Sequence, residues 1–402
     1  MSFKLSARNG FEYNILKFKV DSIALLLITI FPIIDTFVGF LNQHSDSMES
    51  IVGVLFKSLV LLLLILRVFV LSKYRIFAHL VLCLSLIIIL YQISYYDAKI
   101  VSELSSLTKI LFFVYSILYF ETIAKNDEYT INIKLLLWVY FLSISFNVSV
   151  GVLGYGGHTY ESLEYGVKGF VYAGNELSFL LCLISSCLIY IYRKNIKLVL
   201  VIGLVSVTLG YFIATKSALF GCVFLLAFYF FLYTNYLAKV FVFALCIGAF
   251  FIFPFSNVET QLLSRLLDRF SSVELVSFIF SGRDQYLDII LQYVQDYSSV
   301  FSFLLGYSKT VISQSGYSGV EMDFVDIYFW YGAVFLIFIS CFILSVYLKI
   351  WLSSLKQLDK VYLTLSYSLM IFLSAIAGHV ITSGMISPVF GLYIYLSNRD
   401  NF

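Results

Sequence analysis

The sequence has few charged residues. Only 12% of its 402 residues are charged, whereas 61% are hydrophobic and the mean hydropathy is +0.94. Soluble domains carry about 25% charged residues, and no soluble core could hide so much apolar surface. The composition therefore excludes a soluble globular protein. It predicts one integral membrane domain, residues 1–402, with no separate soluble domain.

The sequence also has no cysteine outside its apolar stretches and no motif for a nucleotide or a metal ion. The position of all six cysteines argues against a disulfide framework. There is no glycine-rich phosphate loop, no Cys/His ligand spacing and no paired acidic motif suited to Mg²⁺. The net charge of +2 gives no sign of a nucleic-acid partner. We therefore expect no cofactor, no metal ion and no nucleic acid.

What the sequence does contain is a series of apolar stretches long enough to cross a bilayer, which takes about 20 residues as a helix. The first, 21–41, follows four basic residues as a signal peptide would, but it is too long and has no small-residue cleavage site. We interpret it as an uncleaved first helix. The predicted spans of this all-α protein are twelve in number, at 21–41, 51–72, 76–95, 104–122, 134–153, 172–192, 197–214, 217–236, 239–255, 325–347, 361–379 and 384–397.

The basic residues predict the orientation of these spans. Alternating the loops places 16 of the 26 Lys and Arg residues on the side of both chain ends. The positive-inside rule then puts both termini in the cytoplasm. Seven basic residues fall on the outer side, and four of these lie in one long connection, 256–324, between the ninth and tenth spans.

A connection as long as 256–324 is expected to be functional. Apolar residues recur at helical spacing in its first part, opposite Arg265 and Arg269, at Leu262, Leu263, Leu266, Leu267 and Phe270. This pattern predicts an amphipathic helix on the membrane surface. A second such segment is predicted from Asp284 to Val300.

Unusual polar residues gather on the predicted outer side. Asp35 lies in the outer half of the first span, where a carboxylate is costly and typical of a functional site. Capping of a kink or pairing with a neighbouring helix is the alternative. Asn175 and Glu176 lie at the outer end of the sixth span. Helix capping explains Asn175 but leaves Glu176 unexplained.

Two basic residues on this side are suited to anions. Lys216 lies in the short turn 214–217, where an ammonium and a helix N-terminus together favour a phosphate. Snorkelling of its side chain to the lipid headgroups explains it as well. Arg283, after Gly282, offers paired donors for a diphosphate. A surface ion pair with Asp284 or Asp288 is the alternative.

Three carboxylates, Glu321, Asp323 and Asp326, lie at the outer end of the tenth span. Stabilisation of a helix N-terminus accounts for one of them. Another is a candidate general base whose pKa is raised by its neighbours. His379 ends the eleventh span, where a lone histidine is usually structural and a direct role is the alternative.

This set of residues fits transfer of a sugar from a lipid diphosphate. Such a donor is already activated, so it needs only cations to stabilise the leaving diphosphate and a base to deprotonate the attacking hydroxyl. A lipid-linked oligosaccharide flippase is the main rival, because it has similar hydropathy, but it would have charges along a central cavity and two related halves. A purely structural assembly protein is the third hypothesis. The sequence shows no internal repeat, and its charges favour one face.

The order of the polar segments resembles a known family. GFVYAGNELS (169–178), ATKSALFG (214–221), SGRDQY (281–286), EMDFVDIYFWYG (321–332) and GHVITSGMISP (378–388) look like the O-antigen polymerase and ligase superfamily, specifically Wzy-type surface-polysaccharide polymerases. The resemblance implies a metal-independent glycosyltransferase with a GT-C-like fold. It would lie in the bacterial cytoplasmic (inner) membrane, with its site facing the periplasm or the exterior.

The resemblance also implies the reaction and the site. A growing glycan would pass from undecaprenyl diphosphate to an incoming lipid-linked repeat unit, with a flippase and a chain-length regulator as further partners in the bilayer. Glu321 would be the base, at the place where ligases carry a histidine, which favours a polymerase over an O-antigen ligase. The other expected catalytic residues are Asp323, Asp326, Glu176 and His379. The expected substrate-binding residues are Arg283, Arg265, Arg269, Lys216, Asn175, Tyr286 and Asp35.

Overall fold

A computed structural model describes residues 2–43, 49–124, 127–160, 164–171, 173–235, 239, 280 and 282–399. Ten helices within these ranges are long and apolar enough to cross a membrane. They surround a core of buried aliphatic and aromatic side chains. The protein is therefore an all-α polytopic membrane protein, as the hydropathy predicts.

Ten of the predicted spans correspond to single helices. Their bounds in chain order are α1 (Ser2–Asn42, apolar from Lys19), α2 (Glu49–Leu71), α3 (Arg75–Tyr96), α4 (Ile100–Ile123), α5 (Thr130–Val152), α6 (Gly174–Ile191), α7 (Ile196–Ile213), α8 (Lys216–Tyr233), α15 (Asp323–Trp351) and α16 (Gln357–Ala377). A short 3₁₀ helix, η1 (Asp127–Tyr129), precedes α5. The predicted ninth span, 239–255, lies outside the described residues except for Lys239.

The predicted twelfth span, 384–397, is wrong as a continuous helix. The structure has a 3₁₀ helix, η5 (Ser387–Val389), and a short helix, α17 (Leu392–Ser397). Six helical residues rise about 9 Å, far less than a bilayer needs. Pro388 has no N–H to continue an α-helix. Non-helical backbone is tolerated at membrane depth where protein buries it, and every residue from 380 to 397 is buried.

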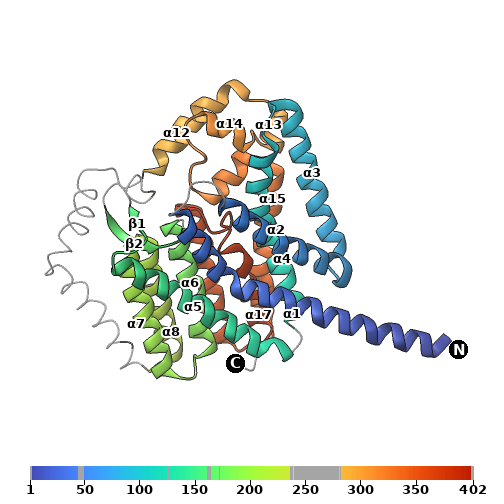
Figure 1. The fold of residues 1–402 in the computed structure, drawn as a ribbon, viewed down its shortest axis with the longest axis vertical. Helices are drawn as coiled ribbons and strands as arrows, with labels where there is room; N and C mark the ends of the chain where they lie inside the picture. Colours follow the sequence, from blue (N-terminus) through green and yellow to red (C-terminus); the bar gives the residue numbers. More distant parts are fainter. Residues whose placement is uncertain are drawn as a thin grey trace.

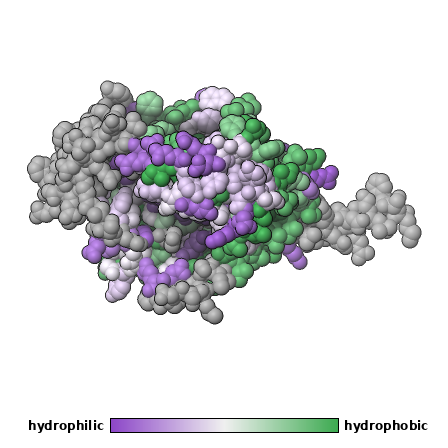
Figure 2. Space-filling model, turned by 90° about the horizontal axis from the view of Figure 1, so that it is seen from above, coloured by the Kyte–Doolittle hydropathy of each residue, from purple (hydrophilic) through white to green (hydrophobic). Residues whose placement is uncertain are grey.

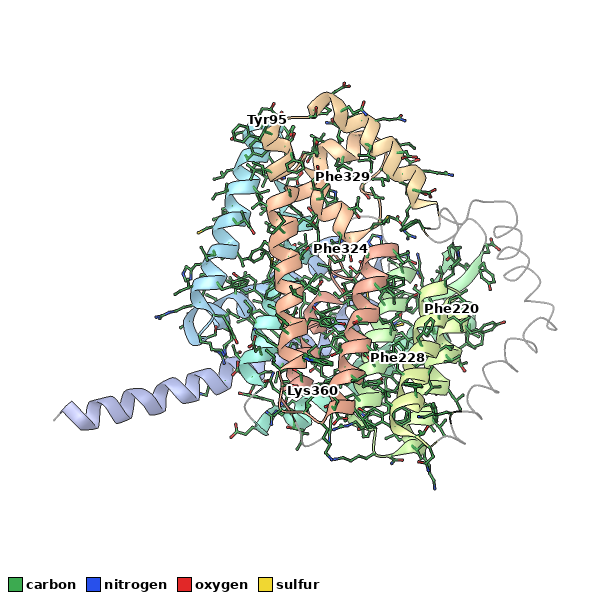
Figure 3. The ribbon with its side chains drawn as sticks, turned by 180° about the vertical axis from the view of Figure 1, so that it is seen from behind. Tyr95, Phe220, Phe228, Phe324, Phe329 and Lys360 are labelled. Carbon is green, nitrogen blue, oxygen red and sulfur yellow. The ribbon has the colours of Figure 1, made fainter. Side chains whose placement is uncertain are left out.

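The described part of the long connection forms helices at one end of the bundle. They are α12 (Arg283–Val294), η4 (Gln295–Tyr297), α13 (Val300–Leu305) and α14 (Lys309–Gln314). α12 covers most of the predicted segment 284–300, whereas the predicted helix at 262–270 lies outside the described residues. Figure 1 shows α12–α14 at the top of the molecule, level with the upper end of α3, and we name this the α12 end of the bundle. In Figure 3, Tyr95 lies at this end and Lys360 at the other.

A β-hairpin that the sequence analysis did not predict lies between α5 and α6. Its strands, β1 (Gly157–Tyr160) and β2 (Tyr165–Gly169), pair antiparallel. Asn147 of α5 accepts a hydrogen bond from the Phe170 N–H at 3.1 Å, just after β2. Gly39 of α1 lets the Phe170 carbonyl approach, because a Cβ there would lie only 1.7 Å from its oxygen. The hairpin is thereby held against α1 and α5.

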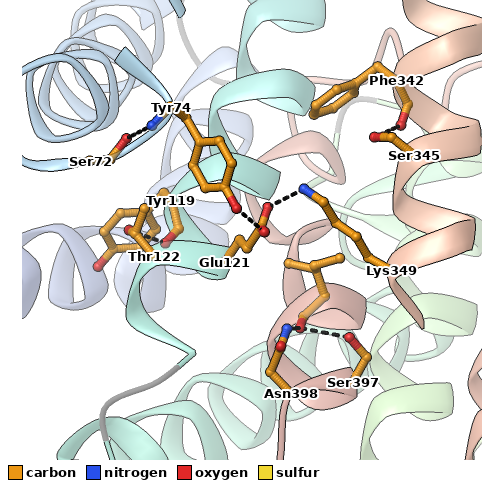
Figure 4. A network of polar contacts seen from close by, with 11 residues as sticks. Ser72, Tyr74, Tyr119, Glu121, Thr122, Phe342, Ser345, Lys349, Ser397 and Asn398 are labelled. Carbon is orange, nitrogen blue, oxygen red and sulfur yellow. Dashed lines mark hydrogen bonds and ion pairs between the residues drawn. The ribbon is translucent and has the colours of Figure 1, made fainter. Parts of the chain in front are cut away.

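Ion pairs link the helices at the opposite end, which we name the Arg193 end. The pairs join α1 to α2, the turn after α6 to α16, and α4 to α15, and a tyrosine hydroxyl donates to each acid. Figure 4 shows the third pair with its tyrosine, Tyr74. Burial of a charge is tolerable when it is paired and hydrogen-bonded. The pairs are Asp21–Arg67 at 2.5 Å, Asp359–Arg193 at 2.8 Å and Glu121–Lys349 at 2.6 Å.

We predict that Arg193→Met destabilises the protein and that adding Asp359→Leu restores most of the loss. Both side chains are more than nine-tenths buried, and removing one partner of such a pair costs about 3–5 kcal/mol, whereas an apolar replacement of both is about neutral. The melting temperature in detergent micelles measures the effect. Lys194→Met is the control, because Lys194 is exposed. A single Arg193 variant as stable as this control would contradict the prediction.

Candidate functional site

The polar residues singled out in the sequence lie at the α12 end. Glu176 lies in the first turn of α6, Lys216 begins α8, Asp323 begins α15, and His379 follows the end of α16. Seen from above, this face gathers hydrophilic residues next to a hydrophobic flank (Figure 2). The predicted clustering on one side of the helices is therefore present within the described part of the chain.

Asp323 is wholly buried and organises the chain that follows α16. Its two carboxylate oxygens accept five hydrogen bonds from that region, and a carboxylate offers only about four lone-pair sites. These bonds use up the acceptor sites of the two oxygens, so Asp323 positions the chain after α16. Its predicted catalytic role stays a prediction. The donors are the Ser374 hydroxyl at 2.6 Å, the N–H groups of His379, Val380 and Ile381 at 2.8–2.9 Å, and the Thr382 hydroxyl at 2.5 Å.

Asp326 has a similar task on the other side of Glu321. It is buried, and its Oδ1 accepts the Val320 N–H at 2.6 Å. A Cβ on Gly319 would lie 2.6 Å from the same oxygen, so only glycine fits beside it. Asp326 thus holds the loop that ends at Glu321. Of the three carboxylates, only Glu321 has a half-exposed side chain.

Glu321 forms an ion pair with Arg283. Arg283 Nη2 lies 3.1 Å from Glu321 Oε2, and the two side chains are 10% and 44% exposed. Gly282, with φ of 85°, turns the chain into α12 so that Arg283 is its first residue. Within the described residues, the Arg283 Nε–H has no hydrogen-bond partner. The pair therefore combines a buried guanidinium that has an idle donor with a carboxylate that solvent or substrate can reach.

Strained backbone surrounds this pair. Glu321 has φ of 62° and His379 has φ of 59°, a region that non-glycine residues rarely occupy. Gly378 lies between them, and a Cβ there would be 2.3 Å from the Glu321 carbonyl oxygen. Such strain costs about 1–3 kcal/mol per residue and persists where the surroundings impose it, often at active sites. His379 itself is half-buried, and its backbone N–H donates a hydrogen bond to Asp323.

Tyr286 lies one turn along α12 from Arg283 and stacks on Tyr317, with ring centroids 4.6 Å apart. In the described part of the connection, α14 is docked on α4. Buried Glu103 accepts the N–H groups of Lys309 and Thr310, which begin α14. Burial and, after it, Lys109 lower the pKa of Lys309. The start of α14 is therefore held by a buried carboxylate of the bundle.

The Lys216 turn is anchored to α6. Thr215 is the N-cap of α8 and accepts the Ala218 N–H, while its hydroxyl lies 2.6 Å from that of Ser178. Lys216 is the first residue of α8, so the predicted helix N-terminus is present, and its side chain is half-buried. The capping interpretation of Asn175 is wrong, because α6 begins one residue earlier and its N-cap is Ala173.

Asp35 and Lys57 form a second ion pair, 3.0 Å apart, between α1 and α2. Glu176 lies near enough to repel Asp35 electrostatically. The sequence analysis counted Lys57 only as a basic residue inside a span. The signal that could have identified it is its position in the outer half of the second span, at the depth of Asp35 in the first.

Residues 378–384 connect the two ion pairs. A Cβ on Gly378 would touch the Glu321 backbone, and one on Gly384 would lie 3.4 Å from Lys57 Nζ. Six residues of chain span at most about 20 Å. The site therefore has two charged ends joined by one loop, which Asp323 holds in place.

Among the described residues no group of three His, Cys, Asp or Glu side chains could hold a metal ion. Arg265 and Arg269 lie outside the described residues. No protein-family model matches the chain, and no curated protein sequence matches it. The fold and the site therefore define a class, the polytopic α-helical membrane proteins, with a polar, doubly charged site at one end of the bundle.

We predict that Asp323→Asn loosens the chain after α16. The amide keeps one acceptor oxygen and turns an NH₂ toward groups that are themselves donors. Two lost charge-assisted bonds at about 1.5 kcal/mol each correspond to roughly 100-fold faster local opening. Hydrogen exchange at the Val380 and Ile381 amides measures this opening. Asp288→Asn, on the exposed face of α12, should leave that exchange unchanged, and protection equal to wild type in Asp323→Asn would refute the assignment.

Proposed function

We propose that the protein is a surface-polysaccharide polymerase. It transfers a growing glycan from undecaprenyl diphosphate to an incoming lipid-linked repeat unit on the outer side of the bacterial cytoplasmic membrane. The observation that carries the proposal is the Arg283–Glu321 pair, in which residues 38 positions apart join a buried cation to an accessible carboxylate. The resemblance of the polar segments to Wzy-type polymerases supports the same reaction.

The pair supplies the two groups that the transfer needs. The acceptor hydroxyl oxygen forms a bond to the anomeric carbon of the donor sugar, and the bond from that carbon to the diphosphate breaks. Undecaprenyl diphosphate leaves with the electron pair, and Arg283 stabilises its charge. The hydroxyl proton passes to Glu321 as general base.

The resting ion pair has a role in this mechanism. A diphosphate that binds Arg283 competes with Glu321 for the guanidinium, because both are anions. Glu321 is then released from its partner and is available to accept a proton. Its side chain can move because it is 44% exposed, whereas the Arg283 side chain is 10% exposed and stays in place.

The charges at the Arg193 end favour this proposal over a flippase. An alternating-access transporter opens to both sides of the membrane. In this protein the Asp21–Arg67 and Asp359–Arg193 pairs are buried at that end. Within each pair the two side chains are bonded to one another, and a tyrosine donates to the acid. Opening there would break both pairs, and an unpaired buried charge costs about 3–5 kcal/mol.

We predict that Arg283→Ala and Glu321→Gln each abolish chain lengthening by purified, folded protein given undecaprenyl-diphosphate repeat units. Loss of one charge-stabilising group costs about 10²–10³ in rate, and loss of a general base about 10²–10⁴. The product ladder on a gel measures lengthening. Glu321→Gln keeps a hydrogen-bond acceptor for Arg283, and its melting temperature, measured alongside, separates loss of activity from loss of folding. Asp288→Asn is the matched carboxylate control and should retain activity.

Three outcomes would count against the polymerase. If folded wild-type protein leaves the repeat units unextended, the polymerase proposal is wrong. Movement of the lipid-linked unit between leaflets would establish the flippase instead. Transfer of the glycan to a lipid A–core acceptor, without lengthening, would establish an O-antigen ligase.

A further inference from the structure

The Asp35–Lys57 pair differs from the buried ion pairs at the other end of the molecule. Asp35 Oδ1 pairs with Lys57, but the buried Oδ2 has no hydrogen-bond partner within the described ranges. The Asp35 side chain is only 10% exposed, whereas 32% of Lys57 is exposed. The pair therefore has one acceptor oxygen without a partner, beside an ammonium group that solvent or a ligand can reach.

The two fully buried pairs show how the carboxylate oxygens of a structural ion pair are bonded in this protein. Asp21 uses both oxygens, one on Arg67 Nε and the other on Arg67 Nη2 and Tyr129. Asp359 likewise uses both, on Arg193 and Tyr233. If the Asp35–Lys57 pair only held α1 against α2, Asp35 would not need an oxygen without a partner. An unsatisfied buried acceptor is destabilising, more so when it is charged, and it calls for an explanation.

The charges around the pair indicate what kind of ligand completes it. Asp35 and Glu176 are acids and Lys57 is a base, so acids outnumber bases around the pair. An anion such as a diphosphate is repelled by the two carboxylates. A neutral polyol is suited to the pair, because one sugar hydroxyl can donate to Asp35 Oδ2 while another accepts from Lys57.

The loop 378–384 relates this pair to the Arg283 end of the site. Gly384 brings the loop backbone close to Lys57, and a Cβ there would lie 3.4 Å from Nζ. The other end of the loop touches Glu321. Since six residues reach at most about 20 Å, a short lipid-linked saccharide can contact both ends at once.

We infer that Asp35 and Lys57 bind hydroxyl groups of the saccharide, while the diphosphate binds separately at Arg283. This inference rests on the proposed function, which supplies a saccharide and a diphosphate in one substrate. It adds Lys57 to the site and assigns Asp35 to sugar recognition rather than to the diphosphate. The lipid-linked unit would then be held at two places in one site, with its sugar at the Asp35–Lys57 pair and its diphosphate at Arg283.

Two probes separate the ends in a binding experiment. One is the repeat-unit oligosaccharide released by mild acid from the host's own lipid-linked pool, which carries no diphosphate. The other is undecaprenyl diphosphate without sugar. Titration calorimetry with purified full-length protein in detergent gives the affinity for each. Neither measurement requires turnover.

Asp35→Asn and Lys57→Met should each weaken binding of the free oligosaccharide at least 10-fold, because one hydrogen bond to a charged group is worth about 1.5–3 kcal/mol. Both should leave undecaprenyl diphosphate binding unchanged, and Arg283→Ala should show the reverse pattern. The exposed neighbour Ser58 provides the control Ser58→Ala. The double variant Asp35→Asn/Lys57→Met leaves no unpaired charge, so it folds where a single variant does not and should show the same loss.

The outcomes keep this inference apart from the proposed function. Oligosaccharide affinity unchanged in the folded double variant, or weakened diphosphate binding instead, would overturn the saccharide subsite. No oligosaccharide binding by the wild type would overturn it as well. If the variants lose the oligosaccharide but the wild type lengthens no chain, the subsite stands and the polymerase proposal fails.

Discussion

The candidate site depends on the buried carboxylate of Asp323. Its two oxygens collect donors from α16 and from the four residues that follow Gly378. Because Asp323 is itself the first residue of α15, these bonds fasten the start of one helix to the end of the next. Glu321 lies two residues before Asp323, and the His379 N–H is one of the five donors. The strained φ angles of both residues persist because the anchor determines the path of the chain on either side.

The same constraint, that every backbone polar group at membrane depth needs a partner, explains the broken elements of the fold. The chain after α16 is irregular, and Asp323 accepts its first N–H groups. Further along, the Ser116 hydroxyl donates to the Ser387 carbonyl at 2.6 Å. α15 has a break at Gly332, and the Phe329 carbonyl before it accepts the Tyr307 N–H at 2.7 Å. Irregular backbone therefore occurs where side chains or the segment between α13 and α14 supply the missing partners.

Hydropathy predicts the long spans because about 20 apolar residues are a strong signal, but it does not distinguish burial in lipid from burial in protein. Segment 384–397 is apolar for the second reason, and its break is invisible to that signal. The site was partly predictable in the same way. Sequence places the Glu321, Asp323 and Asp326 carboxylates at one helix start, but only their tertiary donors show which of them is accessible. Lys57 was missed because its partner, Asp35, lies on another helix.

The acids of the buried ion pairs differ between the two ends of the bundle in how fully their oxygens are hydrogen-bonded. At the Arg193 end, Asp21 and Asp359 have both oxygens bonded. At the α12 end, Asp35 Oδ2 and Arg283 Nε lack partners among the described residues, although both side chains are nine-tenths buried. An idle buried polar atom is a cost to the unliganded protein that a correctly shaped ligand removes. The two idle atoms have opposite polarity and lie at opposite ends of one loop, so they favour a ligand with a hydroxyl-rich part and an anionic part over a uniformly charged one.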